Sequence, residues 1–316
     1  MSIMTVTGPI KKENLEFCQC HEHLFIKKGK SKEINSALYL NDFEATVKEL
    51  QIYKRSGGRS IVDAQPLGCG RMTNNLIKAA KDTGLNIIAS TGFHKLMFYP
   101  YDHWIRNVNH KEFKHILKEE IEKGMYLNTE KIYPNKQVQA KAGIIKTAYS
   151  EEHIANIDTY EKLLAAAAQV AVDTDTTIMC HTDKGQGALK VIDILTDNGL
   201  SSNSIIICHL DRRIDNYDFH YKVADKGVYL DYDTIGRFKY HSDEEEINLI
   251  QNMINMGYLD NLLLALDTTR NRHKSYGGNI GLNYILETFI PLMKEAGIKS
   301  EQIKKMMIEN PARVLD

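Results

Sequence analysis

Two neighbouring stretches, TTIMCH at residues 176–181 and SIIICHL at residues 204–210, decide the fold because both repeat one pattern. Each is a short, β-branched, apolar run that reaches a histidine. Six further runs of this kind occur along the chain: LEFCQC (15–20), RSIVDA (59–64), LNIIAST (85–91), AKAGIIKTA (140–148), GVYLDYDT (227–234) and NLLLALD (261–267). Continuous apolar runs of this length are typical of parallel strands buried on both faces.

Segments with helical periodicity lie between most of these runs. The segment 41–58 has one apolar face and ends in two glycines, and later helical segments begin with the expected caps Asp158 and Ser242. No Pro/Gly/Ser-rich linker interrupts the alternation. The pattern predicts an α/β protein, a single (β/α)8 TIM barrel over residues 1–316, with residues 124–140 as an ordered insertion at the rim.

The overall charge excludes some classes of partner. Forty basic residues face forty-one acidic ones, so we expect no nucleic acid and no membrane surface as a partner. The sequence has no membrane-spanning apolar run and no secretory-type start, which predicts a cytoplasmic protein. Five scattered cysteines predict reduced thiols. The number of subunits stays open, and a homo-oligomer is compatible with the sequence.

Histidines stand at the ends of several predicted strands. Residues i and i+2 of a strand point to the same side, so His21 and His23 should face the barrel interior together. The same alternation predicts that His181 and His209 point inward. It predicts the opposite side for the neighbouring residues, namely Cys18, Cys20, Glu22, Cys180 and Cys208. The role of Cys69 stays open.

These histidines predict a metal site. The strand ends contribute four imidazoles and one carboxylate: His21, His23, His181, His209 and Asp267. All of them belong at the C-terminal face of the barrel, where catalytic groups gather in this architecture. Imidazoles with a carboxylate around an open position are the ligands of a catalytic zinc-type site.

Lys146 is the unusual member of the fourth strand, because a charged lysine is costly inside an apolar strand. A lysine kept neutral by neighbouring metal charge can add carbon dioxide and become N6-carboxylysine. Such a carbamate is a bidentate anion that can bridge two cations, which would explain six ligands. We therefore expect two divalent ions, zinc with manganese or cobalt as substitutes, and carbon dioxide as the source of the Lys146 carbamate.

Together these motifs resemble the phosphotriesterase family of the amidohydrolase superfamily, and its phosphorylated sugar lactonases in particular. The resemblance covers nearly the whole chain: HEHL (21–24), KAGIIK (141–146), the single histidines 181 and 209, ALDTTR (265–270) and ENPARVL (309–315). It implies that His21, His23 and Asp267 bind the more buried ion. It also implies that His181 and His209 bind the more exposed ion, and that Lys146 bridges the two.

The resemblance and the rim loops suggest a reaction. A hydroxide that bridges the two ions would attack an ester, and Asp267 would carry its proton to the leaving group. DRR at 211–213 is interpreted as a solvated loop without a catalytic role. The loops after the last two strands carry cations that predict a small anionic substrate held by its phosphate: Arg237, Lys239, Arg270 and Arg272. The predicted substrate is a phosphorylated sugar lactone, a furanose lactone phosphate.

Two alternatives remain open at this point. A phosphotriesterase or unphosphorylated lactonase would accept neutral substrates and gain nothing from a phosphate. A non-catalytic, metal-binding regulatory barrel would bind ions without turning over esters. A mononuclear deaminase-like enzyme is disfavoured, because one ion would not require Lys146.

Overall fold

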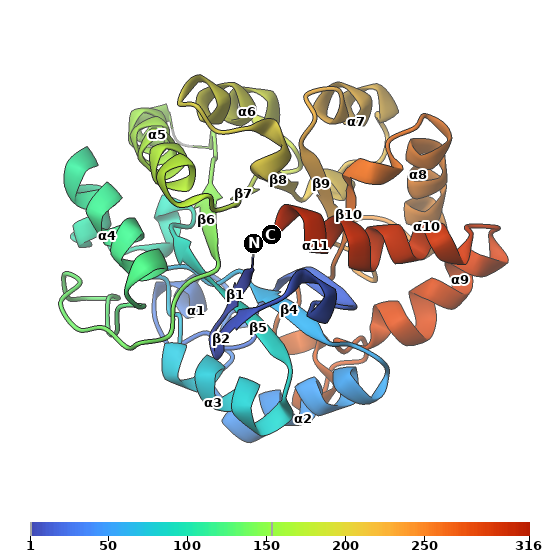
Figure 1. Ribbon diagram of the computed structural model, residues 1–316, viewed down its shortest axis with the longest axis horizontal. Helices are drawn as coiled ribbons and strands as arrows, with labels where there is room; N and C mark the ends of the chain where they lie inside the picture. Colours follow the sequence, from blue (N-terminus) through green and yellow to red (C-terminus); the bar gives the residue numbers. More distant parts are fainter. Residues whose placement is uncertain (1, 153) are drawn as a thin grey trace.

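Eight parallel strands form a nearly closed barrel surrounded by helices (Figure 1). The computed structural model describes residues 2–152 and 154–316. The strands pair in chain order: β3 (Cys18–Glu22), β4 (Ser60–Asp63), β5 (Asn86–Gly92), β6 (Ile144–Ala148), β7 (Ile178–His181), β8 (Ile205–Cys208), β9 (Tyr229–Tyr232) and β10 (Leu262–Leu264). Each of the eight predicted runs overlaps one of them, so the predicted fold class is confirmed.

The seam of the barrel lies between the first and last strands, β3 and β10. The amide of Asp267 donates to the carbonyl of His21 at 3.0 Å. The buried carboxylate of Glu22 accepts hydrogen bonds from the amides of Leu266 and Thr268, each at 2.9 Å. The Glu22 carboxylate thereby accepts the backbone hydrogen bonds that a neighbouring strand would otherwise accept from the residues after β10.

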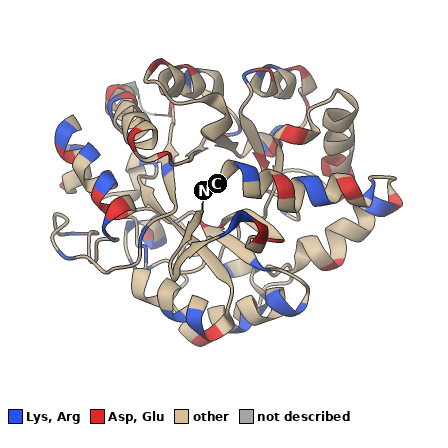
Figure 2. Ribbon diagram, viewed as in Figure 1, with Lys and Arg blue, Asp and Glu red and all other residues tan. Residues whose placement is uncertain are grey.

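Helices cover the outside of the barrel, as expected for βα units. They are α1 (Lys30–Ile34), α2 (Phe43–Arg55), α3 (Thr73–Thr83), α4 (His110–Glu122), α5 (Ile157–Thr174), α6 (Ala188–Asp197), α7 (Tyr217–Ala224), α8 (Asp243–Asn255), α9 (Ile290–Glu295), α10 (Ser300–Lys304) and α11 (Asn310–Val314). None of the described helices is both long and apolar enough to cross a bilayer. Positions of Lys, Arg, Asp and Glu are spread over these helices and the loops between them (Figure 2).

Two N-terminal helix caps were predicted, and the observed starts of α8 and α5 can be compared with them. Ser242 caps α8 in a reciprocal capping box with Glu245, so this prediction is confirmed. The prediction for α5 is wrong by two residues, because the helix begins at Ile157 with Asn156 at the cap position. Asp158 lies in the first turn of α5, where a negative charge still interacts favourably with the helix dipole.

The N-terminal end of the barrel is closed by both ends of the chain. The hairpin of β1 (Ile3–Thr5) and β2 (Gly8–Ile10) and the end of α11 pack under the strands (Figure 1). Ile3, Leu15, Val314 and Leu315 join the apolar interior there. The opposite, C-terminal end of the barrel is left for polar side chains.

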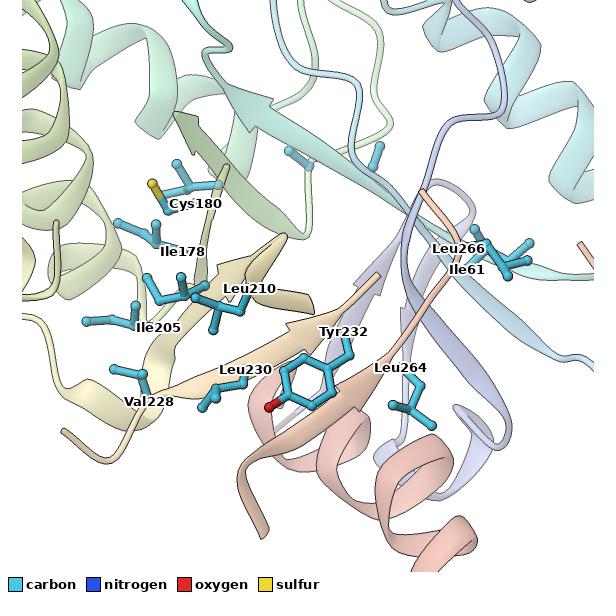
Figure 3. Packing of buried hydrophobic residues seen from close by; sticks show 14 of the residues in the cluster. Ile61, Ile178, Cys180, Ile205, Leu210, Val228, Leu230, Tyr232, Leu264 and Leu266 are labelled. Carbon is cyan, nitrogen blue, oxygen red and sulfur yellow. The ribbon is translucent and has the colours of Figure 1, made fainter. Parts of the chain in front are cut away.

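A second apolar layer lies between the strands and the helices. Side chains such as Ile178, Ile205, Leu230 and Leu264 project from the strands into this layer (Figure 3). The predicted insertion at residues 124–140 is ordered. An antiparallel bridge joins Tyr126 and Gln137, and the amide of Met125 donates to the carbonyl of Ala140.

Gly92 sits where β5 passes closest to β6. A Cβ atom at Gly92 would lie 1.8 Å from the carbonyl oxygen of Lys146, and the residue has a φ of +97°. Gly92→Ala should therefore lower the free energy of unfolding by about 3 kcal/mol or more, because the strand bearing Lys146 must move. Gly257→Ala is the matched control, with a φ of +92° but open space around the new methyl group. Equal losses in chemical denaturation would contradict the steric explanation.

Candidate metal centre

All six predicted ligands lie at the C-terminal ends of the strands, and all are buried. His21, Lys146 and His181 lie in β3, β6 and β7. His23 and His209 follow β3 and β8, and Asp267 lies in the segment after β10. His209 and Asp267 have left-handed backbone conformations, with φ values of +67° and +45°. These turns direct the two side chains back over the barrel mouth.

The imidazoles of neighbouring strands face one another across the barrel mouth. His181 Nδ1 and His209 Nε2 are 2.7 Å apart. On the other side of the mouth, Lys146 Nζ lies 3.2 Å from His21 Nε2. The Lys146 side chain is fully buried and follows Ile144 on the inward face of β6. The residues predicted from four different strands therefore meet at one place.

The outer ring nitrogens of these histidines have carboxylate partners. Asp233 bridges two of them: its oxygens lie 2.8 Å from His21 Nδ1 and 2.6 Å from His209 Nδ1. Asp183 Oδ1 is 3.4 Å from His181 Nε2. A carboxylate on one nitrogen holds the proton there, which leaves the lone pair of the other nitrogen directed into the site.

Burial keeps the imidazoles uncharged. Burial lowers the pKa of His21 and of His209 well below the usual value, and it lowers the pKa of His181 to about 3. Within the described chain, His23 Nδ1 is buried without a hydrogen-bond partner. Neutral imidazoles, a carboxylate and a buried amine are a donor set that fits divalent transition metals.

Asp267 supplies the carboxylate of the centre. Its Oδ1 lies 3.3 Å from His23 Nε2 and 3.9 Å from His21 Nε2. Its Oδ2 accepts from Arg212 at 2.8 Å and lies 3.1 Å from Arg237. Burial opposes ionisation, but Arg237, His23 and Arg212 together hold the pKa of Asp267 well below its usual range. The carboxylate is therefore ionised, as a ligand or proton acceptor must be.

The family model for the phosphotriesterase family matches residues 1–315. The chain belongs to the phosphotriesterase family. The predicted resemblance is thereby confirmed. The family implies a divalent metal site, and His21, His23 and Asp267 form one of the described groups that could hold such an ion.

Individual relatives agree with this family. A phospho-furanose lactonase of Mycoplasmopsis synoviae is 32% identical, over 98% of this chain and 90% of the relative. The structure of an amidohydrolase from Mycoplasma synoviae superposes with a TM-score of 0.92 at 31% identity, covering 99% and 91% of the two chains. The phosphotriesterase homology protein of Escherichia coli, solved with phosphate in its active site, gives 0.85 at 27% identity, covering 96% and 99%. This family member is therefore a hydrolase, and the alternative of a non-catalytic barrel loses its support.

The prediction that residues 211–213 form a solvated loop is wrong for two of the three. Asp211 is fully buried and accepts from the amide of Thr234, and the Arg212 side chain is only 11% exposed beside Asp267. Arg213 alone is solvated, with Asp215 as its partner. The left-handed turn at His209 folds the loop over the metal centre, a turn that the apolar pattern of the strand did not reveal.

The predicted orientation of the cysteines is only partly right. Cys180 faces the helix layer as expected (Figure 3). Cys18, Cys20 and Cys208 instead face the barrel interior. On β3 the pairing register shifts between Gln19 and Glu22, so that strict alternation fails before the histidines are reached. On β8 the left-handed turn follows directly after Cys208, so the next side chain is no longer on the opposite side. All five thiols, including Cys69, are buried and unpaired.

The four rim cations occupy different environments. Arg237 contacts Asp267, and Lys239 is exposed with its ammonium over the ring of Tyr240. Arg270 donates to the carbonyl of Tyr39 and stacks near Tyr276. The buried guanidinium of Arg272 donates to the carbonyls of Leu266 and Ile235, so we expect it to hold two loops in shape rather than to face a substrate.

Sequence reasoning missed the carboxylates behind the histidines. Asp231 and Asp233 follow Tyr229 at intervals of two residues, so the inward alternation of this strand already contained the signal. Asp183 is held by Lys95 Nζ at 2.9 Å and by the hydroxyl of Ser150 at 2.7 Å. These partners come from three different loops, and no local pattern in the sequence links them.

Asp233→Asn should weaken the binding of both ions by about 10- to 100-fold, the usual effect of losing an outer partner of metal-binding histidines. An amide can accept from one ring but must donate to the other, which forces one imidazole to protonate its inward nitrogen. Asp231→Asn is the comparison, since Asp231 lies 3.3 Å from His21 alone. Chelator competition measures the affinities. Loss of a single ion in both variants would contradict the bridging role of Asp233.

Proposed function

We propose that this protein hydrolyses a small phosphorylated ester, a furanose lactone phosphate. The reaction would use two divalent ions, with zinc as the expected metal. The observation that supports the proposal most directly is the convergence of six buried ligand groups at the rim that also carries Arg237, Lys239 and Arg270. The relative from Mycoplasmopsis synoviae supports the choice of substrate, because it is named a phospho-furanose lactonase. Bound phosphate in the active site of the Escherichia coli relative supports an anion-binding pocket.

We assign the ligands to two positions. His21, His23 and Asp267, whose ligand atoms lie within 4.8 Å of one another, would hold one ion. His181 and His209 would hold the other, and Lys146 would bridge the two as its carbamate, formed when the neutral amine adds carbon dioxide and loses a proton. When bound, the two ions activate water as a nucleophile and polarise the ester carbonyl.

The side chains of this chain then have separate tasks. Asp267 is ionised and lies among the proposed ligands, so it can accept a proton from the attacking water and deliver it to the leaving alkoxide. Arg212 and Arg237 keep that carboxylate charged and fix its direction. Arg237, Lys239 and Arg270 would hold the phosphate, which positions the lactone through contacts remote from the reacting bond.

Lys239→Met tests the substrate, because Lys239 is exposed and its removal should not disturb folding. The specificity constant for a phosphorylated lactone should fall by the equivalent of about 1.5–3 kcal/mol, as for a lost hydrogen bond to a charged group. The constant for the unphosphorylated lactone should hardly change. Lys222→Met on α7 is the matched control. Equal losses on both lactones would favour a phosphotriesterase or an unphosphorylated lactonase instead.

A further inference from the structure

A cavity of about 870 Å³ lies beside the metal centre, among the loops that follow the first three barrel strands. Its walls are the segment Lys27–Glu33 after β3, Gly68–Gly70 after β4 and Met97–Tyr101 after β5, with Glu130 and Lys131 of the insertion. The six residues of the metal centre are all described, and none of them lines this cavity. A volume of this size is in the range of sites for cofactors and other organic ligands.

The lining of the cavity is strongly cationic, although the whole chain has a formal net charge of −1. Two carboxylates, Glu33 and Glu130, face six cations: Lys27, Lys28, Lys30, Lys32, Arg106 and Lys131. Such a surplus of one sign in a concave surface attracts anions of several charges more strongly than a flat surface of mixed charge would. The cavity therefore differs from an ordinary solvated surface of mixed charge.

Some of these cations already have partners. Lys27 lies 3.4 Å from Glu130, Lys30 lies 2.9 Å from Glu33, and the ammonium of Lys32 lies 4.1 Å from the centre of the Tyr39 ring. Across the described part of the chain, Lys28 and Lys131 take part in no ion pair or hydrogen bond. These two lysines approach the cavity from different loops, so a ligand between them would be held from two sides.

The same lining offers aromatic surface. Tyr101 is 91% exposed at the cavity, and Arg106 lies 6.0 Å from the centre of its ring. Phe98 and Tyr99 add apolar wall beside it. An exposed ring beside cations is the arrangement on which planar bases stack while their phosphates are neutralised.

We propose that this cavity binds a nucleoside polyphosphate, a multiply charged anion joined to a flat aromatic base, at a place separate from the metal centre. The phosphates contact Lys28 and Lys131, and the base stacks on Tyr101. An occupant would also touch Phe98, whose ring lies 4.7 Å from that of His94, and His94 lies 4.9 Å from His181 of the metal centre.

The single tryptophan of the chain offers a direct measurement. Trp104 lies two residues before the cavity residue Arg106, and its Nε1 donates to the carbonyl of Thr129, which precedes Glu130. Titration of the metal-loaded enzyme with MgATP, in excess magnesium, should change Trp104 fluorescence in a saturable manner. Calorimetry under the same conditions gives the affinity independently of the fluorescence.

Three variants decide where and how the nucleotide binds. The double variant Lys28→Glu/Lys131→Glu should weaken MgATP by about tenfold or more, as expected for lost charge-assisted contacts, and Lys81→Glu on α3 should not. Arg237→Met, beside the metal centre, should leave the affinity unchanged. Tyr101→Ala should weaken MgATP but not inorganic triphosphate.

The proposal is overturned if neither method detects saturable binding at millimolar MgATP, or if the double variant binds as tightly as the parent enzyme. A loss of affinity in Arg237→Met would place the nucleotide at the metal centre and would likewise overturn a separate site. Equal binding of MgATP by the parent enzyme and Tyr101→Ala would overturn the stacking of the base.

Discussion

Lys146→Ala should lose bound metal and turnover together, with a fall in kcat/KM well above the ~100-fold reached by losing outer partners of metal ligands. Lys146 is fully buried, and its Nζ lies 3.2 Å from His21 Nε2 at the centre of the ligand set. Alanine removes the only group that we assign to both ions. The metal content of the purified protein, measured by elemental analysis, should fall from two ions per chain to fewer than one.

Two controls separate the loss of the bridge from the loss of packing. Lys146→Met keeps most of the side-chain volume, so it should fold normally and still fail to bind two ions. Short carboxylic acids should restore part of the activity of Lys146→Ala by occupying the place of the carbamate. A Lys146→Ala protein that retains both ions and its rate would contradict the proposed bridge.

Asp267→Asn should lower kcat by at least ~100-fold while the fold is retained, because an amide cannot take up the proton that a positioned carboxylate accepts. The change also leaves Arg212 and Arg237 without their shared partner. Thermal unfolding and metal content should be measured beside the rate. A variant with both ions bound and unchanged turnover would exclude Asp267 from the chemistry.

A second variant tests whether the arginines left without a carboxylate partner explain the fall in kcat. Adding Arg212→Gln to Asp267→Asn removes one uncompensated buried cation and should recover stability. If the missing proton acceptor is the cause, the double variant regains stability but not rate. Recovery of the rate would mean that Asp267 acts only by neutralising the arginines.

The barrel could be predicted from the sequence because its signal is local. Several strands are continuous apolar runs, as in Ile205–Cys208, and the periodicity changes between runs. The convergence of the candidate ligands could be predicted for a related reason: strand ends of a parallel barrel meet at one rim, so His181 and His209 had to be neighbours.

The remaining parts of the site depend on backbone geometry that has no local pattern. The register shift before His21 and the left-handed turn at His209 reversed the expected directions of three cysteines and brought Arg212 inward. Asp233 was visible in the alternation of its strand, but its simultaneous contact with His21 and His209 arises only when the ends of β3, β8 and β9 meet at the mouth of the closed barrel. Such contacts follow from the closed fold rather than from any single segment.

The seam between β3 and β10 has a consequence for biosynthesis. Glu22 bonds to the backbone of Thr268 across 246 positions of sequence, and Asp267 bonds to His21 in the same seam. The ribosome must therefore have synthesised the chain past Thr268 before His21 and His23 can meet Asp267. Nascent or truncated chains that end between His209 and Asp267 would carry all four histidines and still lack the carboxylate, so metal retention would report that translation has passed Asp267 and that the ring has closed.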